Sequence, residues 1–432
     1  MQPSLWSFPE FSTFLVANTI SRFCASGLSV LLGFQIYELT HDPFYLGLLG
    51  LMQAIPGVTL VLYGGDVADR RSRRGMVYLS FAALAVLSAV LAYASKDGQQ
   101  AVPAIFLVAF LTAGIRSFES PAATGLEAQV LPVEHVMRGV PLLATSGRAA
   151  DVVAPAAAGF AWGLIGPAPT YALMAGLFLF ACVAIAFRVG EKPALHKGGD
   201  GSQVWTRIKE GISYVFGNQL LVGSMALDLF AVFFAGANAL LPIVATEVLH
   251  VGAEGFGLLR SATAAGALTA AMLATRFLSM EKAGRMLHAV IAVFGVSIIV
   301  FGLSQSFALS LAALFVAGLC DGGSMVIRHT ILRLASPDAL RGRIAAVKSV
   351  FVGSANELGS FQSGMTASVI GAAPALCAGG VITLVVVVTV ALRAPELWNL
   401  DLGKQSTAPQ CAFRSPLCAQ PVRRASIIAK MA

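Results

Sequence analysis

Apolar stretches of about 18 or more residues recur along the whole chain, and they constrain its fold more than any other feature. Of the 432 residues, 57% are hydrophobic and only 12% are charged, whereas about a quarter are charged in a typical soluble domain. This much apolar surface cannot be hidden in a water-soluble core. We therefore expect an all-α protein whose helices cross a membrane, because a helix satisfies its own backbone hydrogen bonds in lipid.

Polar residues divide the apolar stretches into twelve expected transmembrane helices. Their expected bounds are residues 11–37, 45–65, 76–94, 102–123, 140–163, 169–187, 219–242, 255–275, 286–303, 307–327, 344–370 and 375–392. No basic segment precedes the first apolar stretch, so we interpret it as a retained span rather than a cleaved signal.

Basic residues lie almost entirely in every second connection between the expected spans. If both termini are cytoplasmic, the outside connections hold only Lys96, and the inside connections hold the other loop arginines and lysines. The positive-inside rule therefore places both termini in the cytoplasm. The net charge of +7 reflects this topology, and no nucleic-acid partner is expected.

The two halves of the chain resemble each other in sequence. "YLGLLG" (45–50) corresponds to "FGLLRS" (256–261), and "LVAFLTAG" (107–114) corresponds to "FVAGLCDG" (315–322). A third pair, "LPVEHVMRG" and "SPDALRG", follows in the same order, and all three lie about 205 to 210 residues apart. Two repeats of six helices have the same orientation in the membrane because six is an even number.

The polar stretch "RVGEKPALHKGGDGSQ" separates the two repeats. We therefore divide the chain into a six-helix bundle (1–187), a cytoplasmic linker (188–218), a second six-helix bundle (219–392) and a tail (393–432). Apolar residues at helical spacing around Trp205 to Val215 predict an amphipathic helix at the membrane surface within the linker. The tail is polar and aperiodic, so we expect it to be disordered.

A strongly charged connection follows the second expected span, with the sequence "GGDVADRRSRRGMV" (64–77). It resembles the signature loop of the major facilitator superfamily, G-x-x-x-D-R-x-G-R-[RK]. The positions that fit the pattern are Gly65, Asp69, Arg70, Arg73 and Arg74. Ser72 stands where the family has a glycine, which leaves the tight turn open to question.

Three other segments extend this resemblance over residues 11 to 392. "DALRGRI" (338–344) precedes span 11 where the family commonly has Arg-Gly-Arg. Span 5 contains "RAADVVAPAAAG" (148–159), which resembles the signature of exporting members at Pro155 and Gly159, although Ala154 replaces a glycine. Residues 37–65 resemble the enterobactin-exporter-like subgroup of bacterial efflux members. The resemblance implies twelve transmembrane helices in two parallel-repeat six-helix bundles, the major facilitator fold. It also implies a place in the cytoplasmic (inner) membrane of a bacterium.

In this family the loop aspartate latches the two bundles together, and the resemblance assigns that role to Asp69. A carboxylate near the N-terminal end of span 11 would be stabilised by the helix dipole. The alternative is that the arginines only anchor the loop to anionic headgroups. If Asp69 is the latch, Asp69→Asn slows transport while the protein still folds.

Ionisable residues deep inside spans are costly and are candidates for function. Counting about 1.5 Å per residue places five of them roughly 10 to 20 Å from the cytoplasmic ends. They are Arg22, Arg148, Asp151, Asp228 and Glu357.

These five residues have different possible partners. Arg148 and Asp151 share one helical face, so they either neutralise each other or line a cavity. Asp228 and Glu357 have no opposite charge within one turn, so each needs a partner on another helix, water or a proton. A carboxyl group that is protonated on one side of the membrane and deprotonated on the other can couple proton entry to export. Arg22 either binds an anionic substrate or pairs with one of these two carboxylates.

Other charges and cysteines have structural explanations. Arg260 and Lys348 lie near span ends and are expected to extend to water. Arg116 with Glu119 resembles the family element Arg-x-x-Gln-Gly only in part. The cysteines within spans are typical of small buried side chains. No spacing of Cys and His residues suggests a metal site, and no cofactor is expected.

The sequence contains no P-loop, no HExxH motif and no nucleophile elbow, so we do not expect an enzyme. We expect a secondary transporter that exports a small amphipathic molecule, such as a siderophore or a drug, in exchange for protons. The expected partners are the substrate, protons and the bilayer, and the chain is expected to act as a monomer. An importer or a lipid flippase remains the main alternative, and a membrane receptor is a more distant one.

Overall fold

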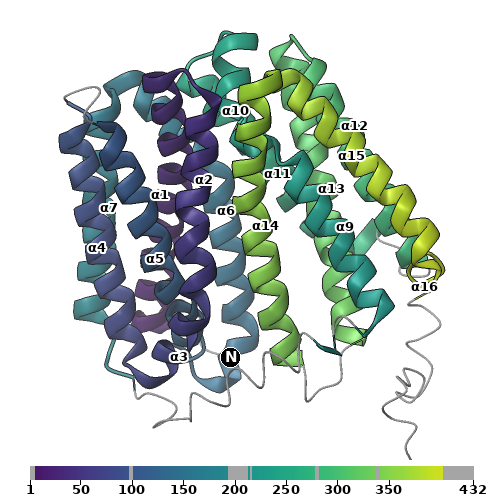
Figure 1. The fold of residues 1–432 in the computed structure, drawn as a ribbon. Coiled ribbons are helices and arrows are strands. Elements are labelled where there is room, and N and C mark those ends of the chain that lie inside the picture. Colours follow the sequence, from purple (N-terminus) through teal and green to yellow (C-terminus); the bar gives the residue numbers. More distant parts are fainter. Residues whose placement is uncertain are drawn as a thin grey trace, which may run out of the picture.

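A computed structural model describes residues 5–96, 101–192, 213–214, 217–277, 282–335 and 341–401. Every regular element among these residues is a helix. The long helices run side by side along one direction of the molecule (Figure 1). The predicted all-α fold is confirmed.

The helices fall into two groups along the chain. The first group is η1 (Leu5–Ser7), α1 (Pro9–Thr40), α2 (Pro43–Thr59), α3 (Val61–Arg70), α4 (Arg73–Ala94), α5 (Ala101–Glu127), α6 (Val133–Ile165) and α7 (Pro167–Arg188). The second is α9 (Gln219–Ala235), η3 (Ala237–Ala239), α10 (Leu241–Ile243), η4 (Val244–Val248), α11 (Ala253–Phe277), α12 (Ala283–Leu303), α13 (Phe307–Ala335), α14 (Arg341–Ile370), α15 (Ala372–Arg393) and α16 (Pro395–Trp398). The twelve expected spans correspond to α1, α2 with α3, α4 to α7, α9 with its continuation, and α11 to α15.

Nine helices in the described part of the chain are long and apolar enough to cross a membrane. The other three spans are α2, which has 17 residues, and the longer helices α6 and α14, which have 33 and 30. The last two have the length of a span but are less apolar than the other nine. They carry most of the predicted intramembrane charges, among them Arg148, Asp151 and Glu357.

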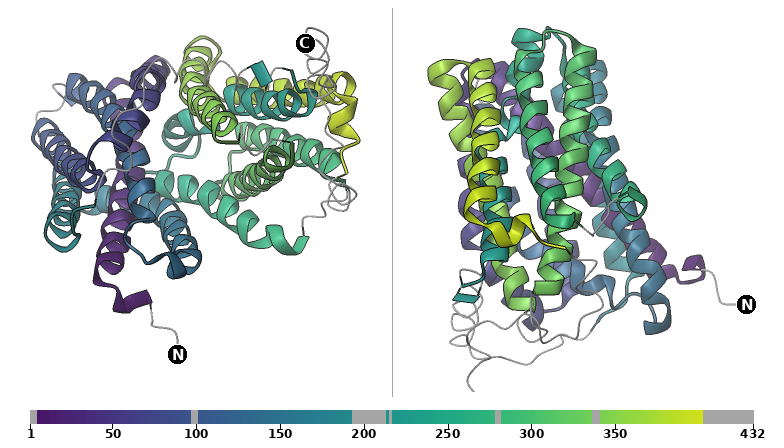
Figure 2. Two further views of the ribbon diagram at one scale, coloured as in Figure 1. Left: turned by 90° about the horizontal axis from the view of Figure 1, so that it is seen from below. Right: turned by 90° about the vertical axis from the view of Figure 1, so that its right-hand side faces the viewer.

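The two groups form two bundles, with α1 to α7 on one side and α9 to α15 on the other (Figures 1 and 2). We call the face that carries the N-terminus, α3 and α16 the N-terminal face, and the other the opposite face. Near the opposite face, one apolar cluster includes residues of both bundles, such as Leu31 and Phe301. Near the N-terminal face each bundle has its own cluster, around Phe11 in one and Leu287 in the other. Among the described residues, the apolar cluster that joins the two bundles therefore lies near the opposite face.

The seventh span is broken at the depth of the membrane. The regular helix α9 ends at Gly236, and the chain continues through a 3₁₀ turn, a short α-helical turn and a π-helical turn to Val248. Gly236, with φ −67° and ψ 77°, leaves helical geometry and ends the regular helix. Irregular backbone at this depth is tolerated where it lines a cavity.

The tail begins later than predicted. Residues 393–401 were expected to be disordered, but they complete α15 and form α16. Leu397 and Leu400 are buried against the second bundle because the carbonyl of Leu397 lies beside Gly284, where there is no side chain. Of the predicted amphipathic helix of the linker only residues 213 and 214 are described, and the tail after Asp401 lies outside the described residues.

Candidate functional site

Two helix crossings close the opposite face, and both depend on glycine. Where α2 meets α14, a Cβ on Gly364 would lie 2.5 Å from the Cα of Gly47. Where α6 meets α11, a Cβ on Gly159 would lie 2.2 Å from the carbonyl oxygen of Ala253, and one on Gly257 would lie 2.4 Å from that of Pro155. Any larger residue would push the backbones apart. Pro155 and Gly159, the predicted span 5 signature, thus lie in the contact between the bundles.

The two crossings are related by the internal repeat. Gly47 precedes Gly257 by about 210 residues, and Gly159 precedes Gly364 by about 205, which is the offset of the sequence echoes. The second helix of one bundle therefore crosses the fifth helix of the other in both places. We call these two crossings together the seal. Each repeat contributes its second and its fifth helix to it.

Side chains complete the closure around the glycine crossings. The Tyr37 hydroxyl at the end of α1 donates a hydrogen bond to the Glu247 carboxylate of the other bundle. Phe34 stacks on Phe256 with ring centroids 5.4 Å apart. These contacts also join the bundles at the opposite face.

Beneath this seal lie two adjoining cavities between the bundles, with volumes of about 330 and 350 Å³. The first is lined by polar side chains, which include Ser29, Gln53, Asn238, Arg260, Asn356 and Glu357. The second is mostly apolar and is lined by residues such as Leu28, Leu32 and Val58, with Arg116 and Thr112. Ser29, Gln53, Gly353 and Glu357 line both, so they mark the boundary between the polar and the apolar chamber.

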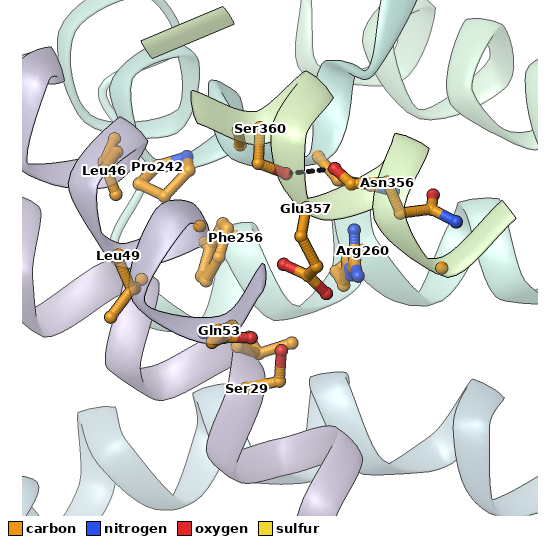
Figure 3. A pocket seen from close by; sticks show the side chains of 16 residues that line it. Ser29, Leu46, Leu49, Gln53, Pro242, Phe256, Arg260, Asn356, Glu357 and Ser360 are labelled. Carbon is orange, nitrogen blue, oxygen red and sulfur yellow. Dashed lines mark hydrogen bonds between the residues drawn. The ribbon is translucent and has the colours of Figure 1, made fainter. Parts of the chain in front are cut away.

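Glu357 is the predicted carboxylate that the structure places in the cavity. It lies on α14, and Figure 3 shows its side chain beside that of Arg260 on α11. One turn further along, Ser360 packs against Gly50 at the seal. Glu357 therefore lies directly beneath the closed crossing of α2 and α14.

Arg260 does not extend to water at a span end, as the sequence suggested, but lines the polar chamber. It lies close enough to the opposite face to be assigned to a helix end. The closed bundles separate it from that surface. The break in the seventh span supplies a further polar group, because Asn238 lies in the 3₁₀ turn and lines the same chamber.

Asp151 pairs with a residue that sequence spacing could not identify. Nη2 of Arg22 on α1 lies 3.7 Å from Oδ2 of Asp151 on α6, and the two side chains are 47% and 32% exposed. Arg22 fits there because a Cβ on Gly147 would lie only 2.9 Å from its side chain. The partner of Arg22 is thus neither Asp228 nor Glu357. Arg148 contacts Met325 of the other bundle at 4.0 Å instead of forming an ion pair with Asp151.

Asp228 does not line either cavity. Its carboxylate on α9 contacts the guanidinium of Arg328 on α13 in the same bundle, with only 9% and 7% of the side chains exposed. Arg328 also donates hydrogen bonds to the carbonyl and hydroxyl oxygens of Ser324. Of the three possibilities predicted for Asp228, the structure therefore shows the first, a partner on another helix.

Sequence reasoning also missed Asp321 on α13. Arg148 of the first bundle acts electrostatically on its carboxylate. The rule that selects ionisable residues inside spans would have found it.

A further pair joins Arg116 to Glu119 at 3.9 Å within α5. Among the described residues, no three His, Cys, Asp or Glu side chains gather as metal ligands would.

The arginines of the charged loop hold the first bundle together at the N-terminal face. Nη1 of Arg73 donates to the carbonyl of Gly125 at 3.1 Å, and Arg74 contacts the carbonyl of Ala186. Arg70 pairs with Asp66 at 3.0 Å, and Gly65 faces open space.

Ser72, which replaces the family glycine, caps α4 by accepting a hydrogen bond from the Gly75 N–H at 3.3 Å. Its φ of −62° is open to any residue, so the turn needs no glycine. The side chain of Asp69 lies outside the described residues, so its role as a latch stays a prediction.

Two six-helix bundles around a central polar cavity, sealed on one side by close helix crossings, define a membrane transporter of the major facilitator type. The model of the family described as "Transmembrane secretion effector" matches residues 6–428. The chain belongs to this family. It is a multi-pass membrane transporter and not an enzyme.

Individual relatives agree with this assignment. The chain is 23% identical over 345 residues to the enterobactin exporter EntS of Citrobacter koseri, which covers 79% of this chain and 81% of that one. It is 24% identical over 342 residues to the MFS-type transporter YkuC of Bacillus subtilis, covering 74% and 76%.

Solved structures of the same fold include a POT family transporter bound to 5-aminolevulinic acid, with a TM-score of 0.73 and 13% identity over 92% of this chain and 98% of that one. The nucleoside transporter NupG has a TM-score of 0.69 and 13% identity over 88% and 99%. At these identities the likeness shows the fold alone.

Proposed function

We propose that the protein exports small amphipathic molecules, of the siderophore or drug class, across the cytoplasmic membrane in exchange for protons. The observation that carries this proposal is the position of Glu357, a carboxylate inside a cavity between two bundles whose shared apolar cluster lies near one face. Such a group can meet water from one side and, once the bundles rock, from the other. One chain holds both bundles and the whole cavity, so we propose a monomer.

The distribution of charge supports the direction of loading. The N-terminal face carries the arginine-rich loop with Arg70, Arg73 and Arg74, and we assign this face to the cytoplasm. In the described state the glycine crossings and the Tyr37–Glu247 hydrogen bond close the other side of the cavity. Substrate would therefore enter from the cytoplasm in this state and leave outside after the seal parts.

The two chambers support the substrate class. One offers amides, hydroxyls and a charged pair, and the other offers aliphatic side chains. A molecule with a polar head and an apolar body would satisfy both, since polar groups fix its orientation and apolar surface supplies affinity. The similarity to enterobactin exporters favours efflux of a siderophore-like compound over import.

Transport in everted membrane vesicles tests the proposal. Enterobactin and a panel of amphipathic dyes are offered outside, with and without an imposed proton gradient. We expect accumulation that stops when an uncoupler collapses the gradient and that is lost in Glu357→Gln. The surface variant Glu134→Gln serves as the matched control and should accumulate substrate like the wild type.

The same vesicles distinguish the alternatives. Accumulation that survives collapse of the gradient would contradict proton coupling. Uptake only into right-side-out vesicles would show an importer, and movement of a fluorescent phospholipid between leaflets would show a flippase. Flux of no compound in the panel would contradict the proposed substrate class.

A further inference from the structure

Arg260 occupies a fixed position where the two bundles meet. One turn before it on α11, Gly257 packs against the carbonyl of Pro155 on α6. Directly after it, the Ser261 hydroxyl oxygen accepts a hydrogen bond of 3.0 Å from the backbone N–H of Ala156. These contacts involve the α6 backbone, so they set the place of Arg260 relative to the other bundle.

Two carboxylates, one from each bundle, act on the Arg260 guanidinium. Glu357 belongs to the same bundle and faces Arg260 in the polar chamber (Figure 3). Asp151 belongs to the other bundle and lies one turn before Pro155 on α6. Arg260 forms an ion pair within 4.0 Å with neither of them in this state, so no close contact fixes it to either carboxylate.

The charged surroundings of the two carboxylates differ. Arg22, Arg148 and Arg116 act on Asp151 in addition to Arg260. Among the residues that line the polar chamber, Arg260 is the one charged side chain besides Glu357 itself. A change in the charge of Glu357 is therefore felt first by Arg260. Asp151 is left as the other group that attracts the guanidinium.

We propose that Arg260 is the positioning residue that transmits the charge of Glu357 to the contact between the bundles. With Glu357 ionised, the guanidinium is held within its own bundle. With Glu357 protonated, it turns to Asp151 and draws α11 toward α6, which stabilises the seal at the opposite face. This inference rests on the proposed proton exchange, in which the protonated carrier returns to the state that opens to the cytoplasm.

Distances between spin labels test this without a known substrate. In a background without the native cysteines, labels are attached at Met137 and Leu392 to report on the N-terminal face. A second pair at Leu164 and Leu303 reports on the opposite face. These side chains are exposed, and each pair spans the two bundles. Electron–electron resonance distances are recorded at acidic and at alkaline pH in lipid nanodiscs.

We expect acid to shorten the distance at the opposite face in the wild type, with a shift in the two-state equilibrium of about tenfold. Glu357→Gln should show the acid distances at alkaline pH. Arg260→Gln should remove the response to pH, and adding Glu357→Gln to it should change nothing further. Arg260→Lys keeps the charge and should keep part of the response. Arg188→Gln, which removes a surface arginine at the end of α7, should respond like the wild type.

A full response of Arg260→Gln to pH and to Glu357→Gln would overturn the inference. If Arg260→Gln does not fold, Asp151→Asn replaces it and must also remove the response. A third result is that the wild-type distances do not change with pH, but Glu357→Gln changes them when Arg260 is present and not when it is replaced. In that case the inference stands and the proposed proton exchange fails. The two failures are therefore distinguishable.

Discussion

The interior of the second bundle and the interface between the bundles hold buried polar contacts of two different kinds. Asp228 and Arg328 belong to the same bundle and leave less than a tenth of either side chain exposed. Arg260, Glu357 and Asp151 lie at the interface, where no close ion pair fixes Arg260 to either carboxylate. Contacts within a bundle persist when bundles move as rigid bodies, and contacts between bundles must break. The first kind should therefore govern stability, and the second should govern the balance between conformations.

Breaking the Asp228–Arg328 pair should have the largest effect. Asp228→Asn leaves a buried guanidinium without its counter-ion, and we expect the free energy of unfolding to fall by about 3 to 5 kcal/mol. Thermal unfolding of the purified protein in detergent measures the loss. Replacing both partners, with Asp228→Leu and Arg328→Met, should recover most of it. Wild-type stability of the single variant would show that this pair does not hold the bundle together.

Adding a methyl group at the seal should come next. The Cβ of Gly159→Ala would meet the Ala253 carbonyl, so we expect the closed state to lose about 1 to 3 kcal/mol relative to the open one. A cysteine at Leu49 beneath the seal should then react about five to 150 times faster with an impermeant thiol reagent applied from the opposite face. Gly176→Ala on α7, where a Cβ would meet open space, is the control. Equal rates in both variants would contradict the role of the crossing.

Two tyrosine hydrogen bonds allow the same comparison with smaller changes in free energy, because one lies between the bundles and the other within a bundle. Tyr37 donates to Glu247 across the interface, whereas Tyr171 donates to Gln35 at 2.9 Å within the first bundle. Tyr37→Phe should favour opening of the seal by about 0.5 to 1.5 kcal/mol, and Tyr171→Phe should lower only stability. Spin-label distances and thermal unfolding of both variants check this. The comparison breaks down if the two variants change the same quantity.

The smallest expected effect is that of Asp151→Asn on stability. Arg22 and Asp151 are 47% and 32% exposed, so water screens their attraction. We expect the free energy of unfolding to change by less than about 1 kcal/mol. Thermal unfolding alongside Asp228→Asn measures the contrast directly. A loss as large as that of Asp228→Asn would place Asp151 among the contacts that hold the fold.

Much of this fold could be predicted because the bilayer fixes the length and the apolarity of each span. The twelve helices, their order and the two repeats followed from the apolar stretches and the loop charges. Glu357 could be proposed as a cavity residue because an ionised group in lipid is costly.

The partners of the charges could not be predicted, because helix rotation depends on packing between helices far apart in sequence. Asp228 and Glu357 look alike in sequence, yet α13 provides an arginine for one, and the other faces the cavity. The same limit applies to Arg260. Its position near a helix end suggested exposure, and only the closed bundles reveal that it is enclosed.

The two glycine crossings have a consequence for the energy supply of the cell. A plug of flexible side chains can loosen gradually and let ions leak through a half-open pore. Backbone packed against backbone at Gly47 with Gly364 and at Gly159 with Gly257 has no such partial opening, because a small separation of the helices removes the whole contact. The cavity can thus open at the N-terminal face while the opposite face stays closed to ions.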